Sequence, residues 1–130
     1  MFQAPEFVGW GPFMAYEVVT DLRHTRYLKD APDIYTWANA GPGAIRGLNH
    51  MYGRPITTVP PKEQTNREMN QIMLELNALD DPEFNEVFGR VDPRQPRFEM
   101  RDVEHSLCEL FKYVRGYTRS RYDWRKAKPL

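Results

Sequence analysis

Five side chains that could move protons or hold an anion lie close together near the C-terminal end of the sequence: Glu104, His105, Cys108, Glu109 and Lys112. On a helix, spacings of three and four residues place Glu104 beside Cys108. The same spacing gives Glu109 two neighbours, His105 and Lys112. Grouped charges shift one another's pKa values, so this face could supply a general acid and a general base. Composition alone favours the alternative, an ordinary solvent-exposed face with ion pairs between successive turns.

Two glycines one residue apart, Gly9 and Gly11, precede a proline and a segment with helical periodicity. Glycine permits close approach of the backbone, and the N–H groups at the start of a helix attract anions such as a DNA phosphate. The hairpin of helix-hairpin-helix DNA-binding proteins, which include many DNA glycosylases, has this arrangement. A plain turn that starts a helix explains the spacing equally well.

A second glycine-rich stretch contains Asn39, Gly41 and Gly43, with Arg46 one helical turn further on. Backbone N–H groups, the helix dipole and a guanidinium group could converge there on a phosphate or a pyrophosphate. The alternative is a helix that starts at a proline and uses Gly47 for close packing against another helix.

The charges are distributed unevenly, although the net charge is zero. Residues 112–130 hold seven basic residues, Arg115 among them, against one acid, with tyrosines and a tryptophan between them. Basic and aromatic side chains together are typical of nucleic-acid binding. A solvated tail is the alternative. We divide the chain into a helical DNA-modification domain, residues 1–117, and a basic C-terminal tail, residues 118–130.

Length and composition indicate one domain with a substantial core. The chain has 130 residues, of which 13% are aromatic, and a single cysteine that has no internal partner for a disulfide. We therefore expect a reducing compartment, the cytoplasm, and we find no apolar run long enough for a membrane span. The histidines and the cysteine lack zinc-site spacing, and we predict no metal site. No phosphate-binding loop or dinucleotide fingerprint is present.

The elements that must position these residues are helices. Apolar periodicity and proline or glycine punctuation predict helices at residues 13–23, 43–51, 63–79, 82–88 and 101–117, with a single helical turn at 34–38. No strand pattern of useful length is present, so the predicted fold is all-α, a compact helical bundle. The last helix should bury an apolar stripe, with the five reactive side chains on its other side. This stripe consists of Val103, Leu107, Leu110, Phe111 and Val114.

Three stretches of the sequence together resemble a known family. They are GPFMAYEVVTDL at residues 11–22, WANAGPGAIRGLN at 37–49 and MRDVEHSLCE at 100–109, the last followed by Lys112 and Tyr113. They are similar to the α-glutamyl/putrescinyl thymine pyrophosphorylase superfamily and to its close relative, the helical domain of 5-hydroxymethyluracil DNA kinases. These proteins belong to bacteriophages and prophages that hypermodify thymine, and the resemblance implies a helix-hairpin-helix, DNA-glycosylase-like element in the fold.

The resemblance also implies a reaction. A DNA kinase pyrophosphorylates 5-hydroxymethyluracil in DNA, and an amine co-substrate, an amino acid or a polyamine, then displaces the pyrophosphate. The candidates for holding phosphate groups or DNA are Gly9, Gly11, Asn39, Gly41, Gly43, Arg46, Lys112 and Arg115. No cofactor is assigned, and a divalent cation that accompanies the pyrophosphate is left open.

The amine must lose a proton, and the base must leave the duplex to be reached. The candidate proton acceptors are Asp21, Glu104, His105 and Glu109, and the candidate base-stacking residues are Trp10, Phe13 and Trp37. Two alternatives remain open. One is a non-catalytic helical DNA-binding module that partners a 5-hydroxymethyluracil DNA kinase. The other is a glycosylase-like enzyme in which Asp21 or Asp33 stabilises a sugar cation.

Overall fold

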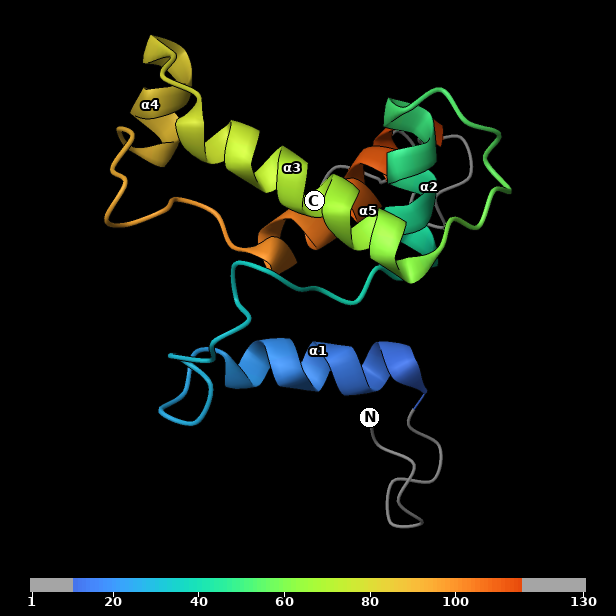
Figure 1. Ribbon diagram of the computed structural model, residues 1–130, viewed down its shortest axis with the longest axis horizontal. Helices are drawn as coiled ribbons and strands as arrows, with labels where there is room; N and C mark the ends of the chain where they lie inside the picture. The colour runs from blue at the N-terminus through green and yellow to red at the C-terminus, as the bar shows by residue number, and fades with distance from the viewer. Residues whose placement is uncertain (1–10, 116–130) are drawn as a thin grey trace, which may run out of the picture.

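The computed structural model describes residues 11–115. In this range the chain forms five α-helices and no strand (Figure 1). The helices are α1 (Pro12–Leu22), α2 (Pro42–Met51), α3 (Lys62–Ala78), α4 (Pro82–Phe88) and α5 (Met100–Arg115). The predicted all-α class is confirmed. None of the helices described at residues 11–115 is both long enough and apolar enough to cross a membrane.

Proline, glycine and aspartate mark the helix ends. Pro12 and Pro42 are the first residues of α1 and α2, where the missing proline N–H costs no hydrogen bond. The helix α4 begins after Asp81, whose side chain accepts a hydrogen bond of 2.9 Å from the N–H of Phe84. It ends at Gly89, which has a φ of 84° that other residues rarely adopt. These signals are local, which explains why the predicted helix bounds lie close to the observed ones.

The centre of the core is the contact between α2 and α5. Ala44 and Leu48 on α2 are fully buried, and Val103 and Leu107 on α5 are almost so. Two glycines on the same face of α2 make this contact possible. A Cβ atom on Gly47 would lie 2.4 Å from the Leu107 carbonyl oxygen, so the helices could not approach this closely with any other residue at that position. The predicted close-packing role of Gly47 is therefore confirmed.

The helix α3 covers another side of α5 and fastens two irregular segments through asparagine side chains. The amides of Asn66 and Asn70 donate hydrogen bonds to the carbonyl oxygens of Thr36 and Tyr35. Farther along α3, Asn77 both donates to and accepts from the backbone of residue 98. These bonds satisfy backbone groups that lack helix partners. The single helical turn predicted at 34–38 is present about one residue earlier, where the N–H of Trp37 donates a hydrogen bond of 2.9 Å to the carbonyl oxygen of Asp33.

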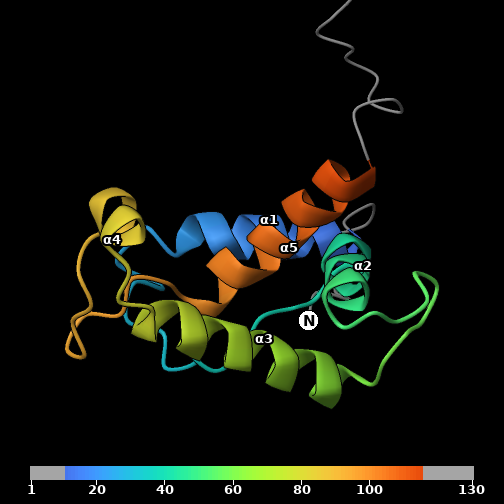
Figure 2. The same cartoon turned by 90° about the horizontal axis from the view of Figure 1, so that it is seen from above.

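The helix α1 lies below the level of α3 and α5 in Figure 1, and from above it overlaps α5, while α3 is displaced to another side of α5 (Figure 2). Two arginines join these elements: Arg101 donates to the carbonyl oxygen of Thr20, and Arg23 pairs with Glu99 at 2.6 Å. The helix-hairpin-helix element is not confirmed, because residues 9 and 10 of the predicted hairpin lie outside the described residues and only the helix after it is seen.

Candidate functional site

Side chains from α1 and α5 meet beside the first turn of α2. We call this group the α1–α5 cluster. It consists of Tyr16, Glu17, Glu104, His105 and Cys108. Tyr16 and Glu17 come from α1, and the other three come from α5, more than 80 residues later in the chain. The fold alone therefore brings these five side chains together.

Glu104 is the most deeply buried member of the cluster, with 4% of its surface exposed. Its Oε1 atom accepts a hydrogen bond of 3.3 Å from the N–H of Gly41, and the Cys108 thiol lies 3.6 Å from the same oxygen. Burial raises the pKa of Glu104 above its ordinary value, and the Gly41 N–H, His105 and the Cys108 thiol each act in the opposite direction. The carboxylate thus caps α2 at a position that an anion could otherwise occupy.

The imidazole of His105 lies between two carboxylates. Its Nε2 atom is 3.6 Å from Glu17 Oε1 and 3.6 Å from Glu104 Oε2. The ring is 45% exposed, yet this nitrogen is buried and has no hydrogen-bond partner among the described residues. Imidazole nitrogens commonly serve as general bases, and this one faces two carboxylate oxygens.

The aromatic ring of Tyr16 lies between this imidazole and a second aromatic ring, that of Trp37. Tyr16 is buried, and its ring contacts His105 and Trp37 edge-on, with both centroid distances at 6.4 Å. Burial, together with the Glu104 carboxylate, raises the pKa of Tyr16 well above its ordinary value, so the phenol keeps its proton. Trp37 is exposed on its other side. A planar group could therefore stack on the exposed Trp37 ring.

An ordinary solvent-exposed face, which composition favours for the five reactive side chains of α5, is wrong for Glu104, because this side chain is buried. The reason is that α5 is covered by α1 as well as by α2 and α3, so more than one stripe of it is buried. Cys108 is half-buried for the same reason, and burial raises the pKa of its thiol to about 12. Glu109 and Lys112 are exposed and paired with each other, as on an ordinary helix surface.

The remaining predicted site residues are scattered. Gly43 faces Cys108 at the contact between α2 and α5, whereas Arg46 lies over the ring of Phe111. The glycines and Arg46 thus do not converge on one point. Exposed residues that lie outside the α1–α5 cluster are Phe13, Asp21, Asp33, Arg46 and Arg115, and Asn39 is half-buried. Gly9 and Trp10 lie outside the described residues.

Sequence reasoning missed Tyr16 and Glu17. Both lie within the first of the three family-like stretches, residues 11–22, and that is the signal that could have identified them. Helical periodicity could not, because it assigns residues to faces of α1 without saying which face meets α5.

The raised pKa of Glu104 predicts how stability depends on pH. The folded protein holds this proton more tightly than the unfolded chain, whose glutamate keeps the ordinary value of 4.5. The contribution of Glu104 to stability is therefore largest below pH 4.5 and falls as the pH rises through the raised value. The glutamine of the Glu104→Gln variant does not ionise, so the stability of this variant should not fall in the same way as the pH rises. Urea unfolding should show the two proteins closest in stability at pH 4 and the variant more stable at pH 7.

A variant that is instead less stable than the wild type at pH 7 would contradict this prediction. It would mean that the hydrogen bond from Gly41 to the ionised carboxylate outweighs the cost of burying the charge. A residue that lowers stability in its ionised form is commonly kept for function.

Comparison with protein families agrees with the motifs in the sequence. The family model described as the helical domain of 5-hmdU DNA kinase matches residues 3–121. The matched range includes all five described helices and every member of the α1–α5 cluster. No match was found among the curated proteins or among the solved structures. The family resemblance inferred from the three stretches is thereby confirmed.

Proposed function

The chain belongs to the family of the helical domain of 5-hmdU DNA kinase, and from this premise we propose that it acts on phage DNA, exchanging the pyrophosphate of a pyrophosphorylated 5-hydroxymethyluracil for an amine. The observation that carries the proposal is the position of His105 Nε2, 3.6 Å from each of two carboxylate oxygens. The reaction needs a proton acceptor, and we assign this role to the imidazole, whose ring is 45% exposed although its Nε2 atom is buried.

In the proposed step the amine nitrogen bonds to the exocyclic carbon of the base. The bond between that carbon and the pyrophosphate oxygen breaks, and its electron pair leaves with the pyrophosphate. The proton that the amine loses goes to His105 Nε2. The carboxylates of Glu17 and Glu104 then stabilise the imidazolium. Trp37 stacks on the base after it has left the duplex.

The leaving pyrophosphate needs hydrogen-bond donors. The N–H group at the start of α2 can serve only if the pyrophosphate displaces the carboxylate that this group already binds. In the structure the Gly41 N–H donates to the Glu104 carboxylate. A pyrophosphate oxygen would have to replace that carboxylate at the Gly41 N–H.

A recognition module without catalytic activity, which partners a 5-hydroxymethyluracil DNA kinase, is the second candidate. One observation favours it. The predicted pyrophosphate donors do not converge, since Gly41 and Gly43 face Glu104 and Cys108 while Arg46 lies over Phe111. Such a module would bind the DNA and leave the chemistry to the kinase.

The test is a mass measurement on the DNA. The full chain is incubated with DNA that carries pyrophosphorylated 5-hydroxymethyluracil, together with glutamate or putrescine, and the DNA is digested to nucleosides. We expect a nucleoside heavier than 5-hydroxymethyl-2′-deoxyuridine by the mass of the amine less one water, and one released pyrophosphate for each adduct. DNA that carries unphosphorylated 5-hydroxymethyluracil is the control and should stay unchanged.

An unchanged nucleoside pool with the pyrophosphorylated substrate would refute the exchange reaction. If the same protein still binds this DNA and raises the activity of a 5-hydroxymethyluracil DNA kinase added to it, the second candidate is the function.

A further inference from the structure

An open hollow of about 710 Å³ lies where the start of α2, the loop between α2 and α3, and the last turns of α5 meet. We call it the Phe111 hollow. The residues of its wall that matter here are Ile45, Arg46, Ile56, Val59, Phe111 and Arg115. It is separate from the α1–α5 cluster, because none of the five cluster residues lines it.

The charge in the Phe111 hollow has one sign. The guanidinium carbon of Arg46 lies 5.3 Å from the centroid of the Phe111 ring, and that of Arg115 lies 5.9 Å from it. No aspartate or glutamate is among the described residues of its wall. The Phe111 ring holds both guanidinium groups by cation–π contact. Because these side chains are already restricted, binding an anion costs less side-chain entropy.

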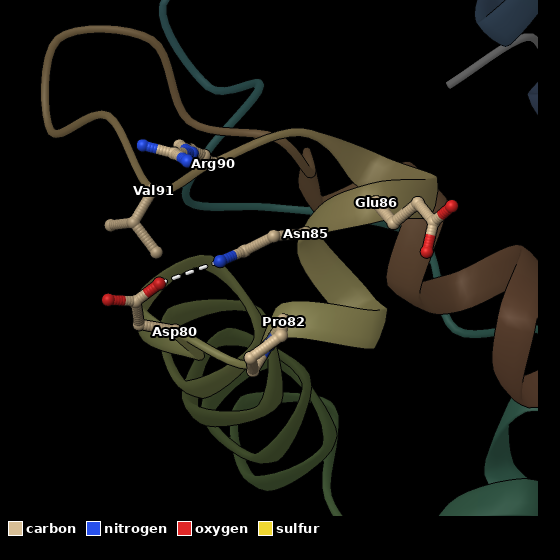
Figure 3. A pocket seen from close by; sticks show the side chains of 6 residues that line it. All are labelled: Asp80, Pro82, Asn85, Glu86, Arg90 and Val91. Carbon is tan, nitrogen blue, oxygen red and sulfur yellow. Dashed lines mark hydrogen bonds between the residues drawn. The ribbon is translucent and has the colours of Figure 1, made fainter.

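A second hollow, beside α4, has the opposite character (Figure 3). Its wall contains two carboxylates, Asp80 and Glu86, and one guanidinium, Arg90. Asp80 also accepts a hydrogen bond of 2.7 Å from Asn85, which bridges the hollow in Figure 3. A phosphate group would be repelled there and attracted to the Phe111 hollow.

The rest of the wall of the Phe111 hollow is apolar and open to solvent. Ile56 and Val59 on the loop are exposed, although both are hydrophobic. A ligand that fits this surface has a negative charge and an apolar portion next to it. A nucleotide unit has this combination, since its phosphate lies next to the deoxyribose and the base.

The segment that follows Arg115 in the sequence is rich in basic residues. Arg115 is the last residue of α5, and it lines the hollow. The chain that continues from it, residues 116–130, carries five basic residues and one acid. These residues lie outside the described part.

We propose that the Phe111 hollow binds the sugar–phosphate backbone of a DNA strand, with Arg46 and Arg115 as the phosphate contacts. This inference rests on the part of the proposed function that makes DNA the substrate, and it does not require the exchange reaction. The hollow holds the strand while the base to be modified is at the α1–α5 cluster.

The test is the salt dependence of binding to unmodified, fluorescein-labelled DNA, measured by anisotropy with the full chain and without amine. Arg46→Gln and Arg115→Gln should each weaken binding roughly tenfold. Each should also reduce the slope of log K against log salt concentration by about 1, because one phosphate contact is lost. Thr57→Glu puts a negative charge on the exposed wall without removing a packed side chain, and it should weaken binding too.

Arg26→Gln is the matched control, because Arg26 is also exposed and also lies over an aromatic ring, 5.0 Å from the centroid of Tyr27, but far from this hollow in the chain. Its affinity and salt slope should equal those of the wild type. Equal losses of DNA affinity in the three arginine variants, or no loss of affinity in any of them, would overturn the proposal. The proposed function is judged separately, since a protein without exchange activity can still bind unmodified DNA through this hollow.

Discussion

The His105→Gln variant should exchange pyrophosphate for an amine at least about 100 times more slowly than the wild type, because general-base catalysis contributes a factor of this size or more. Glutamine can accept a hydrogen bond but cannot take up a proton. The ring of His105 is 45% exposed, so its loss should leave the fold intact. The rate of pyrophosphate release at saturating putrescine gives the measurement.

Two further readouts separate a proton-accepting imidazole from one with only a structural role. An alkyl ammonium loses its proton to water near pH 10. The difference in exchange rate between His105→Gln and the wild type should therefore become smaller as the pH approaches that value. The matched control is His50→Gln, which changes an exposed histidine in the last turn of α2 and should keep the wild-type rate. A His105→Gln enzyme with the wild-type rate at pH 7 would exclude His105 as the proton acceptor.

We expect the second large effect in stability, from Gly47→Ala. The new Cβ atom would lie 2.4 Å from the carbonyl oxygen of Leu107, and that oxygen belongs to the backbone, so α2 and α5 must separate. Separation loosens the packing of Ala44 and Leu48, which are fully buried. We expect the free energy of unfolding to fall by about 3 kcal/mol, although alanine favours a helix by about 1 kcal/mol over glycine. The melting temperature should fall by roughly 10 °C.

The matched control for this change is Gly41→Ala. A Cβ atom there would lie 3.6 Å from Glu104 Oε1, an ordinary contact distance, and the φ of −75° suits alanine. Urea unfolding should show a loss of about 1 kcal/mol or less for this variant. Equal losses for the two variants would mean that the contact between α2 and α5 adapts to the added methyl group, contrary to the packing argument.

The sequence by itself determined the helices and the fold class. Pro12, Pro42 and Gly89 start or stop a helix through their own backbone chemistry. A period of 3.6 residues predicts the buried Val103 and Leu107 of α5, whereas Val114, predicted to lie in the same buried stripe, is exposed. These are local effects that act within a few residues, so they can be recognised without knowing the fold. Close packing at Gly47 could also be predicted, as the alternative to a phosphate site in the same glycine-rich stretch.

Only the tertiary structure decided where the reactive residues lie and which of them are buried. Gly43 and Gly47 lie one turn apart and both face α5, whereas Arg46 lies over the ring of Phe111 farther along α5, so the donors that looked convergent in the sequence are separated. The docking of α1 buries Glu104 and brings Glu17 to the imidazole of His105. Such contacts depend on how helices far apart in the chain pack against one another, and residue types and spacing within one helix carry no information about that packing.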